Sequence, residues 1–510
     1  MTVLRLDGLS PTPVHHLSGT RRVEQSLAAL LPPHTLMQRA GQSIGQLALA
    51  VAPHARKIWV ACGPGNNGGD GLEAAVALQQ AGQSVCVSLL AGQQPSANDA
   101  QAALGRAQAA GLEFVTAPPV LANGDLIIDC LLGIGASRAV TGQMAEWVAL
   151  MNHSAATVLS ADQPTGLDAQ SGQALPDLQG APGPLVHADH TLMLLTAKPG
   201  LFMGAGRDAA GQLWLDTLTQ TPAEHLVLEN APACGQLNPP PPVAPPRRHN
   251  SHKGSYGDVA IVGGEGLAER GLGMRGAALL AASAALHSGA GRVLVSLLDS
   301  ASTPPTEVNP AQPEWMFRTF KALHLHALTV VCGCGGGLAV TRVMAEVLQR
   351  SQQLVLDADA LNAIAGDGVL RQLLQHRSTR ALPTVLTPHP LEAARLLGCS
   401  TADIQAQRLQ SAEALAAKWG CTVVLKGSGT VIACPGQLSR INPTGNGRLA
   451  TAGTGDVLAG GIGAKMAQGP GTPEAAFEAA SAAVYQHGQT ADTWPAHLAL
   501  TASGLAQQLK

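Results

Sequence analysis

Residues 63–71 read Gly-Pro-Gly-Asn-Asn-Gly-Gly-Asp-Gly and decide the fold of the first half of the chain. They stand between an apolar run at residues 57–62, which predicts a strand, and an Ala- and Leu-rich run at residues 72–81, which predicts a helix. Five glycines in nine residues predict a loop that turns at positive φ and lets backbone N–H groups approach a ligand closely. Because a helix N-terminus follows, the ligand is expected to carry a phosphate or pyrophosphate. The loop lacks both the GxGxxG spacing and the Lys-Ser/Thr of a P-loop, and its two asparagines and aspartate disfavour a purely structural turn.

Two aspartates follow further apolar runs in the first half. Residues 84–90, 125–129 and 157–160 predict buried strands. Asp129 closes the second of these runs, and Asp162 comes just after the third. In an open α/β sheet, ligands bind beyond the carboxyl ends of the strands, so both aspartates are candidate site residues. Taken alone, each could equally cap a helix or close a turn.

The second half repeats this style of sequence. Six β-branched runs predict strands, with helices in the gaps between them. The runs cover residues 258–262, 292–297, 329–332, 354–357, 384–386 and 422–425. Each half therefore predicts an α/β fold, a parallel sheet covered by helices on both faces. Since no sequence repeat relates the halves, two different domains are expected rather than a duplication.

A proline-rich stretch separates the halves. Six of the eight residues at 239–246 are proline, which lacks a backbone donor and fixes φ. The stretch predicts a stiff, extended linker. We expect a first domain at residues 1–225, a linker at 226–248 and a second domain at 249–510.

The sharpest motif of the second half is Ala-Gly-Thr-Gly-Asp-Val-Leu-Ala-Gly at residues 452–460. A Gly-Thr-Gly turn that leads into a small-residue helix predicts an anion hole of backbone N–H groups at the helix N-terminus. Asp456, placed there, can accept the proton of a hydroxyl that attacks a phosphate. The alternative, an aspartate that caps its own helix, is weakened by the surrounding glycines.

Three more motifs follow predicted strands of the second half. They are Asp-Ala-Asp-Ala-Leu-Asn at residues 357–362, Thr-Pro-His-Pro-Leu-Glu at residues 387–392 and Lys-Gly-Ser-Gly-Thr at residues 426–430. The lysine loop suits nucleotide phosphates. A lone His389 would more often be structural, but its position at a strand end beside the other motifs makes it a ligand candidate.

Composition narrows the class of protein. The net charge of -3 argues against nucleic-acid binding, which needs a basic face. The most apolar stretch, residues 277–286, is about half the length of a membrane-spanning helix. Nine scattered cysteines, an odd number without zinc-ligand spacing, indicate reduced thiols in a cytoplasmic protein. We expect small-molecule partners, no membrane or nucleic acid, and a homo-oligomer.

The first half, over about residues 15–215, resembles the NAD(P)H-hydrate epimerase family. The resemblance rests on Leu-Met-Gln-Arg-Ala-Gly at residues 36–41, the glycine-rich stretch at 63–71, Asp129 with its glycine-rich continuation, and Ala-Asp-Gln-Pro-Thr-Gly-Leu-Asp at residues 161–168. It implies a Rossmann-like three-layer sandwich that epimerises C6 of the hydrated nicotinamide ring, with Asp162 as the substrate-facing acid/base. It also implies potassium, held by Asn67, Asp129 and Thr165. The dinucleotide would lie against Asn66, Asn67, Gly68, Gly69, Asp70, Gly133, Ile134, Gly135, Ala136, Ser137, Arg138 and Ala139.

Two residues of the first half depart from the family pattern. Thr165 stands where the family usually has serine, which keeps the hydroxyl. Ile134 stands where a small polar residue is frequent, so one contact of that loop would be lost.

The second half, over about residues 249–505, resembles the ribokinase-like superfamily and, within it, the ADP/ATP-dependent NAD(P)H-hydrate dehydratases. The discriminating residues are His-Lys-Gly at 252–254, Gly-Ala at 276–277, and the His389 and Lys426 motifs. The resemblance implies that the C6 hydroxyl of the S hydrate, NADHX or NADPHX, is phosphorylated by ADP, with magnesium as the phosphate partner, and that phosphate is then eliminated. Asp456 would be the base. ADP would lie against Lys426, Gly427, Ser428, Gly429, Thr430 and Gly455, and the hydrate against Ala277, Gly335, His389 and Asp456.

One departure concerns Gly-Cys-Gly at residues 333–335, where the family usually has Gly-Pro-Gly. Cys334 could therefore be considered as a nucleophile, although no base for it is evident in the sequence.

Two other functions remain possible from the sequence. The second half could be a small-alcohol kinase, with the first half as a regulatory nucleotide-binding domain. The first half could also be a binding module without catalysis. The fusion of the two halves in one chain favours repair, because the dehydratase would accept one epimer and the epimerase would supply it from the other.

Overall fold

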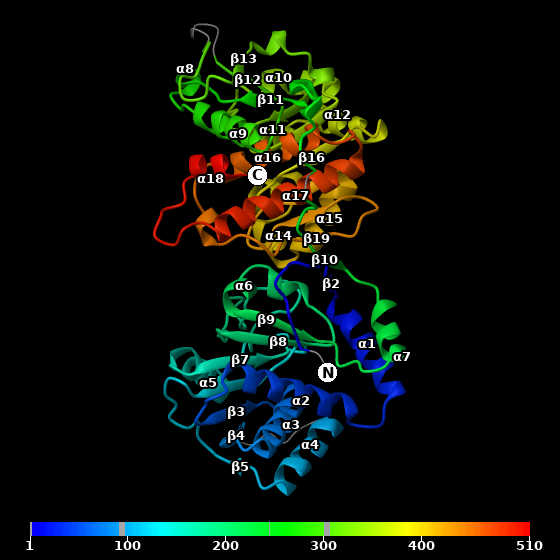
Figure 1. The fold of residues 1–510 in the computed structure, drawn as a ribbon, viewed down its shortest axis with the longest axis vertical. Coiled ribbons are helices and arrows are strands. Elements are labelled where there is room, and N and C mark those ends of the chain that lie inside the picture. The colour runs from blue at the N-terminus through cyan, green and yellow to red at the C-terminus, as the bar shows by residue number, and fades with distance from the viewer. Residues whose placement is uncertain (1–2, 91–96, 244, 300–305, 510) are drawn as a thin grey trace. The chain divides into compact units, whose positions relative to one another are not determined.

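The chain forms two compact units, Met1–Gln236 and Leu237–Lys510. The structure is a computed structural model that describes residues 3–90, 97–243, 245–299 and 306–509 (Figure 1). Within these residues, no helix combines the length and the apolar character needed to cross a membrane.

The first unit is built on an eight-stranded sheet with the order β1-β9-β8-β7-β6-β3-β4-β5. All neighbouring strands are parallel except β1 and β9. The strands of this unit are β1 (Leu4–Arg5), β2 (Pro13–Val14), β3 (Ile58–Cys62), β4 (Val85–Leu89), β5 (Glu113–Phe114), β6 (Leu126–Cys130), β7 (Thr157–Ala161), β8 (His190–Leu194) and β9 (Gln212–Asp216), with β10 (Gly235–Leu237) at its end. The helices are α1 (Leu17–Leu30), α2 (Thr35–Val51), α3 (Asn66–Gln80), α4 (Asn98–Ala109), α5 (Gly142–His153), η1 (Pro199–Phe202), α6 (Gly206–Ala209) and α7 (Pro222–Glu229).

Helices cover both faces of this sheet. Ile58 and Val60 of β3 pack into a core with α2, α3 and α4. Trp59 and Ala61, which point to the opposite face, pack with Trp147 of α5. Because successive strand residues face opposite sides, the all-apolar β3 needs helices on both faces. The predicted three-layer arrangement is confirmed.

The glycine-rich stretch differs from its prediction. Helix α3 begins at Asn66 rather than near residue 72, so most of the expected loop is helical. None of its five glycines has positive φ. A Cβ at Gly68 would lie 1.9 Å from the carbonyl oxygen of Gly63, and one at Gly71 would lie 2.7 Å from the Cβ of Cys130. The glycines therefore allow the first turns of α3 to pack directly against strand ends, and they are not needed for a left-handed turn.

The second unit contains the sheet β13-β12-β11-β14-β15-β16-β17-β18-β19. The strands are parallel from β13 to β17, and β18 and β19 continue the sheet in antiparallel pairs. The strands are β11 (Asp258–Gly263), β12 (Arg292–Leu297), β13 (Met316–Phe317), β14 (Thr329–Cys332), β15 (Gln353–Leu356), β16 (Thr384–Leu386), β17 (Thr422–Leu425), β18 (Val431–Ala433) and β19 (Arg440–Ile441). The helices are η2 (Lys253–Tyr256), α8 (Leu267–Arg270), α9 (Arg275–His287), η3 (Phe320–Ala322), η4 (Leu325–Ala327), α10 (Thr341–Arg350), α11 (Asp359–Gly366), α12 (Gly368–Thr379), α13 (Pro390–Leu397), α14 (Thr401–Ala406), α15 (Arg408–Trp419), η5 (Gly447–Leu449), α16 (Thr454–Ala467), α17 (Pro473–Asp492) and α18 (Ala502–Gln508).

This second sheet is also covered on both faces. Val331 of β14 packs into a core with α9, α16 and α17. On the opposite face, the Cys332 sulfur lies 3.8 Å from that of Met344 on α10. The fold class predicted for this half, a three-layer α/β domain, is confirmed, and four of its six predicted strands have the predicted bounds.

The segment between the halves contains more regular structure than a bare linker. Helix α7 continues to Glu229, and β10 pairs with the antiparallel strand β2. The proline-rich stretch itself, within its described residues, has neither helix nor strand.

Candidate active sites

A cavity of about 660 Å³ opens in the first unit beyond the carboxyl ends of β3, β6 and β7, beside helices α1, α2 and α3. This is the edge of the sheet where the sequence places a ligand. The predicted site residues that line it are Asn66, Asn67, Asp70, Gly133, Ile134, Gly135, Ala136 and Asp162. Gly68, Gly69, Ser137, Arg138 and Ala139 are not among the lining residues.

Asp162 is paired with a buried lysine. The Lys198 ammonium donates to Asp162 Oδ1 at 2.6 Å and to the Leu194 carbonyl at 2.7 Å, and the lysine side chain is fully buried. The backbone N–H of Ile134 donates to Asp162 Oδ2 at 3.2 Å. These two contacts hold both carboxylate oxygens of Asp162 in place beside the cavity. Lys198 was not among the predicted site residues, although the Lys-Pro-Gly that follows the β8 strand could have indicated it.

The wall of this cavity contains unusual backbone. Six described residues other than glycine have positive φ, and four of them line the cavity: His34, Asp162, Leu195 and Leu218. Such conformations cost about 1–3 kcal/mol each and gather where the surrounding structure fixes a functional geometry.

Two further acids line the cavity near Asp162. Burial and the nearby Asp162 carboxylate raise the pKa of Asp70, and the same two causes raise the pKa of Glu24 on α1. The cavity therefore combines an ion-paired carboxylate with carboxyl groups that tend to hold a proton. Such a division is typical of acid/base sites.

The three predicted potassium ligands lie around the same strand ends. Asp129 is fully buried in β6 and accepts hydrogen bonds from Thr165 Oγ1 at 2.7 Å and from Ser160 Oγ at 2.9 Å. The side chain of Asn67 is buried, and neither its amide oxygen nor its amide nitrogen makes a hydrogen bond within the described residues. An unsatisfied buried amide calls for a partner, and an amide, a carboxylate and a hydroxyl are the oxygen donors that suit a hard cation.

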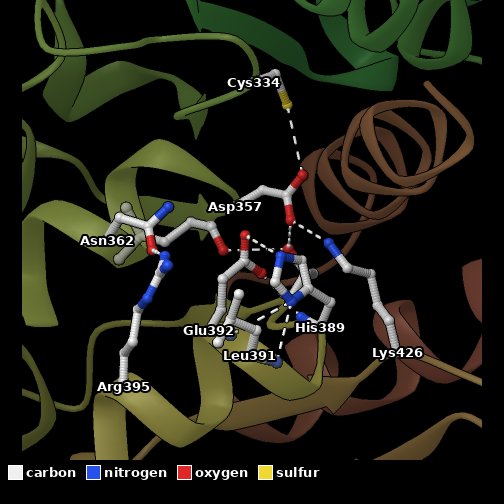
Figure 2. A network of polar contacts seen from close by, with 10 residues as sticks. Cys334, Asp357, Asn362, His389, Leu391, Glu392, Arg395 and Lys426 are labelled. Carbon is white, nitrogen blue, oxygen red and sulfur yellow. Dashed lines mark hydrogen bonds and ion pairs between the residues drawn. The ribbon is translucent and has the colours of Figure 1, made fainter. Parts of the chain in front are cut away.

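In the second unit, Asp357 is the centre of a polar network at the ends of β14, β15 and β16 (Figure 2). Its Oδ1 accepts hydrogen bonds from Lys426 Nζ at 2.6 Å and from Thr387 Oγ1 at 2.7 Å. The next residue, Ala358, has φ of 50° and so turns the chain sharply after β15. The sequence motif containing Asp357 was recognised, but this aspartate was not assigned a role.

Asp456 stands in the first turn of α16, next to this network. Ligand atoms of Asp456, Asp357 and Cys334 lie within 4.8 Å of one another. Burial, followed by the Asp357 carboxylate, raises the pKa of Asp456 to about 6. A carboxylate with a pKa near neutrality is suited to accept a proton during catalysis.

Cys334 is not placed to act as a nucleophile. Its side chain is fully buried, and burial followed by the Asp456 carboxylate raises the pKa of the thiol well above its usual value. The reactive thiolate is therefore disfavoured.

The lysine loop and the α16 N-terminus meet. Lys426 Nζ would lie 3.5 Å from a Cβ placed on Gly455, so the lysine side chain reaches the first turn of α16. The buried His487 of α17, whose pKa burial lowers to about 4, donates from Nε2 to the Thr454 carbonyl at 2.9 Å and fixes the first turn of α16. A cationic side chain beside a helix N-terminus is an arrangement that binds phosphate.

His389 caps helix α13 rather than standing free. Its Nδ1 accepts from the backbone N–H groups of Leu391 and Glu392, and its Nε2 lies 3.1 Å from Glu392 Oε1 (Figure 2). Burial raises the pKa of Glu392 to about 7. The capping box keeps the half-exposed His389 ring near Lys426 and Asp357, whose charges act on it.

The two small residues predicted to face the hydrate are neighbours. A Cβ on Gly335, which has φ of 58°, would lie 2.8 Å from the Cβ of Ala277. The loop that carries Gly335 is held by Glu265, a fully buried residue without a predicted role. The N–H of Glu265 donates to the Gly335 carbonyl at 2.7 Å, and its Oε1 accepts from the Ala339 N–H at 3.0 Å.

Comparison with known proteins assigns the chain to a family. Residues 33–200 match the YjeF-related protein N-terminus, and residues 261–510 match the NAD(P)H-hydrate dehydratase family. The chain is 35% identical over 505 residues to the bifunctional NAD(P)H-hydrate repair enzyme of Escherichia coli, an alignment that covers 94% of this chain and 90% of that protein. The chain belongs to the bifunctional NAD(P)H-hydrate repair enzyme family.

Other relatives match one unit. The ADP-dependent (S)-NAD(P)H-hydrate dehydratase of Neisseria meningitidis is 41% identical over 275 residues, which are 53% of this chain and 88% of that protein. Among solved structures, the ADP/ATP-dependent NAD(P)H-hydrate dehydratase of Bacillus subtilis, co-crystallised with ATP and Mg²⁺, is 31% identical and covers 52% of this chain and 91% of its own, with a TM-score of 0.41.

The alternative of a small-alcohol kinase with a regulatory first half is not supported. The family assignment covers both halves in the order found here. It rests on relatives that are named as repair enzymes and that align with this chain over most of their length.

Proposed function

We propose that the second unit dehydrates the S form of NAD(P)H hydrate at the expense of ADP and that the first unit interconverts the R and S forms. The observation that carries the proposal is the meeting of Lys426, Asp357 and Asp456 at the N-terminus of α16, in a chain of the repair-enzyme family. The names of the relatives supply the substrate class and the nucleotide.

The dehydratase reaction begins with phosphoryl transfer. The phosphates of ADP would lie between the Lys426 loop and the N–H groups of α16, and magnesium, when bound to them, would supply further positive charge. Asp456 accepts the proton of the C6 hydroxyl while the hydroxyl oxygen bonds to the terminal phosphorus of ADP, and AMP leaves. The C6–O bond then breaks with release of phosphate, and the neighbouring carbon loses a proton to form the double bond of NAD(P)H.

The epimerase reaction uses the acid/base pair of the first cavity. Inversion at C6 requires its C–O bond to break: Asp70 or Glu24, which line the cavity with raised pKa values, protonates the C6 hydroxyl, and this group leaves as water while the ring nitrogen supplies an electron pair to C6. Water then adds to the opposite face of C6, and Asp162, which is paired with Lys198, accepts the proton that this water loses. The cavity volume of about 660 Å³ lies within the usual range for sites that enclose a small ligand.

Potassium belongs to this proposal, with Asn67, Asp129 and Thr165 as its protein ligands. The unsatisfied amide of Asn67 and the oxygen-only donor set fit this ion. When bound, potassium would supply positive charge toward the phosphates of the dinucleotide. The protein groups by themselves orient the loop, because Asp129 accepts the backbone N–H and the hydroxyl of Thr165.

We also propose a cytoplasmic homo-oligomer. The nine cysteines are all free thiols, as expected in a reducing compartment. Light scattering after size exclusion tests the assembly: a mass that is a multiple of the 51.9 kDa chain supports it, and a monomer contradicts it.

The proposal is tested by crossed variants of the whole chain. Asp162→Ala should leave the S hydrate to be dehydrated at the normal rate while the R hydrate persists. Asp456→Asn should continue to equilibrate R and S while neither yields reduced dinucleotide. If Asp162→Ala leaves epimerisation intact, the first unit is a binding module and its catalytic assignment is wrong.

A further inference from the structure

A buried arginine lies beneath the Lys426 loop. Arg408 is the first residue of α15, and only 2% of its surface is exposed. Its Nη2 donates to the carbonyls of Leu425 at 3.2 Å, Lys426 at 3.1 Å and Gly429 at 3.3 Å. One guanidinium therefore holds three carbonyls of the segment that joins β17 to β18.

The loop is shaped to fit this guanidinium. A Cβ on Gly427, where φ is 139°, would lie 2.9 Å from both terminal nitrogens of Arg408. Gly429 also has positive φ, at 68°. Gly427 and Ser428 are exposed, whereas Arg408 is buried, so the arginine contacts the inner side of the loop. The two glycines are thus required where the chain wraps the arginine.

The direction of the carbonyls fixes the direction of the neighbouring N–H groups. In a trans peptide the C=O and the following N–H point in opposite directions. Since the carbonyls of Lys426 and Gly429 point inward to Arg408, the N–H groups of Gly427 and Thr430 point outward, to the exposed side. Outward N–H groups beside the Lys426 ammonium form an anion-binding surface.

The positive charge of Arg408 also favours an anion on this loop. Burial alone lowers its pKa, to about 10, and within the described residues no acidic side chain is paired with it. Its nearest polar side-chain partner is the neutral amide of Gln405, at 2.7 Å. A buried cation without a carboxylate favours a negative charge on the loop above it.

We propose that Arg408 is a positioning residue for the nucleotide: it sets the Lys426–Thr430 loop in the conformation that binds the phosphates of ADP. The inference rests on the proposed role of this loop in ADP binding. Arg408 touches neither substrate, so its removal should weaken nucleotide binding rather than alter the chemistry.

Arg377 of α12 offers a matched control. It is 1% exposed, burial lowers its pKa to about 10 as well, and it donates to the carbonyls of Leu348 and Ser351 and to Thr384 Oγ1. Thr384 opens β16, so Arg377 lies at the amino ends of the strands, away from the loop. The two buried arginines therefore hydrogen-bond to the backbone at opposite strand ends of the same sheet.

The test compares Arg408→Met with Arg377→Met in the full-length chain, below the melting temperature of either variant. Both should lower Tm. Only Arg408→Met should raise KM for ADP, by about tenfold or more, with KM for the S hydrate and the epimerase rate unchanged. An unchanged KM for ADP in Arg408→Met, or an equal rise in Arg377→Met, would overturn the proposal.

Two further variants keep the test decisive. Arg408→Lys retains the buried charge but loses the rigid planar guanidinium, whose Nη1 bonds Gln405 while Nη2 bonds the loop, so it should also raise KM for ADP even if the methionine variant does not fold. Gly427→Ala, which places a Cβ against Arg408, should weaken ADP binding as well. If Gly427→Ala weakens binding and both Arg408 variants do not, the loop binds ADP but Arg408 does not position it; if none of them has an effect, the proposed nucleotide site itself is wrong.

Discussion

At the residue scale, each of the two sites depends on an aspartate whose neighbours differ from those of the other. Asp162 is paired with a cation, whereas Asp456 lies beside a second carboxylate and has a pKa raised to about 6. Different surroundings thus suit the same side chain to different steps.

The pH dependence of the dehydratase follows from Asp456. A base acts only when deprotonated, so kcat/KM for the S hydrate should be maximal above about pH 6 and fall tenfold per pH unit below it. Stopped assays with excess ADP, run at a series of acidic pH values, measure this fall in kcat/KM. A profile that stays flat well below this pKa would contradict the assignment of Asp456 as the base.

Removing the partner of Asp162 should affect both stability and epimerisation. In Lys198→Met the carboxylate loses its only cationic partner within the described residues, and such a loss in the interior costs about 3–5 kcal/mol. We expect a lower Tm and a loss of R-to-S conversion, measured by chiral chromatography. The dehydratase rate on pure S hydrate serves as the control, and an unchanged epimerase rate would show that the pair has no catalytic role.

At the element scale, the glycines at the start of α3 are needed for close packing against the strand ends and not for a left-handed backbone turn. Gly68→Ala places a Cβ 1.9 Å from the Gly63 carbonyl oxygen, so it should displace α3 from the sheet and lower the stability of the first unit by several kcal/mol. Gly65→Ala is the matched control, because a Cβ there meets nothing within 4 Å. Thermal unfolding and epimerase assays of the two variants test this reading, which fails if both behave alike.

The sequence predicted elements well and contacts between distant elements poorly. Parallel strands buried on both faces are continuous apolar runs, which is why β12, β14, β16 and β17 were predicted to the residue. The start of α3 at Asn66 was not predicted, because glycine is a weak helix former. Glycine stands at position 68 because the helix packs there against the backbone of Gly63. Lys198 and Arg408 were missed because their partners, Asp162 and the Lys426 loop, are brought to them only by the fold.

At the scale of the whole molecule, one chain carries two sites in separate units. If the hydrate is released between the reactions, the sites need not belong to the same molecule. An equimolar mixture of Asp162→Ala and Asp456→Asn should therefore recover the conversion of R hydrate to reduced dinucleotide, at a rate set by the dilution of each active site. Failure of the mixture, with each remaining activity intact, would indicate transfer of the hydrate within one chain.

The most direct test of the central claim is the fate of pure R hydrate with the wild-type chain, followed by the absorbance of the reduced nicotinamide. Without ADP, R and S should reach equilibrium with no gain in absorbance. On addition of ADP and magnesium, all the hydrate should become NAD(P)H, with one AMP and one phosphate for each molecule repaired. If the R hydrate persists, or if ADP is consumed only with an unrelated alcohol and no reduced nicotinamide forms, the assignment of two coupled repair activities is contradicted.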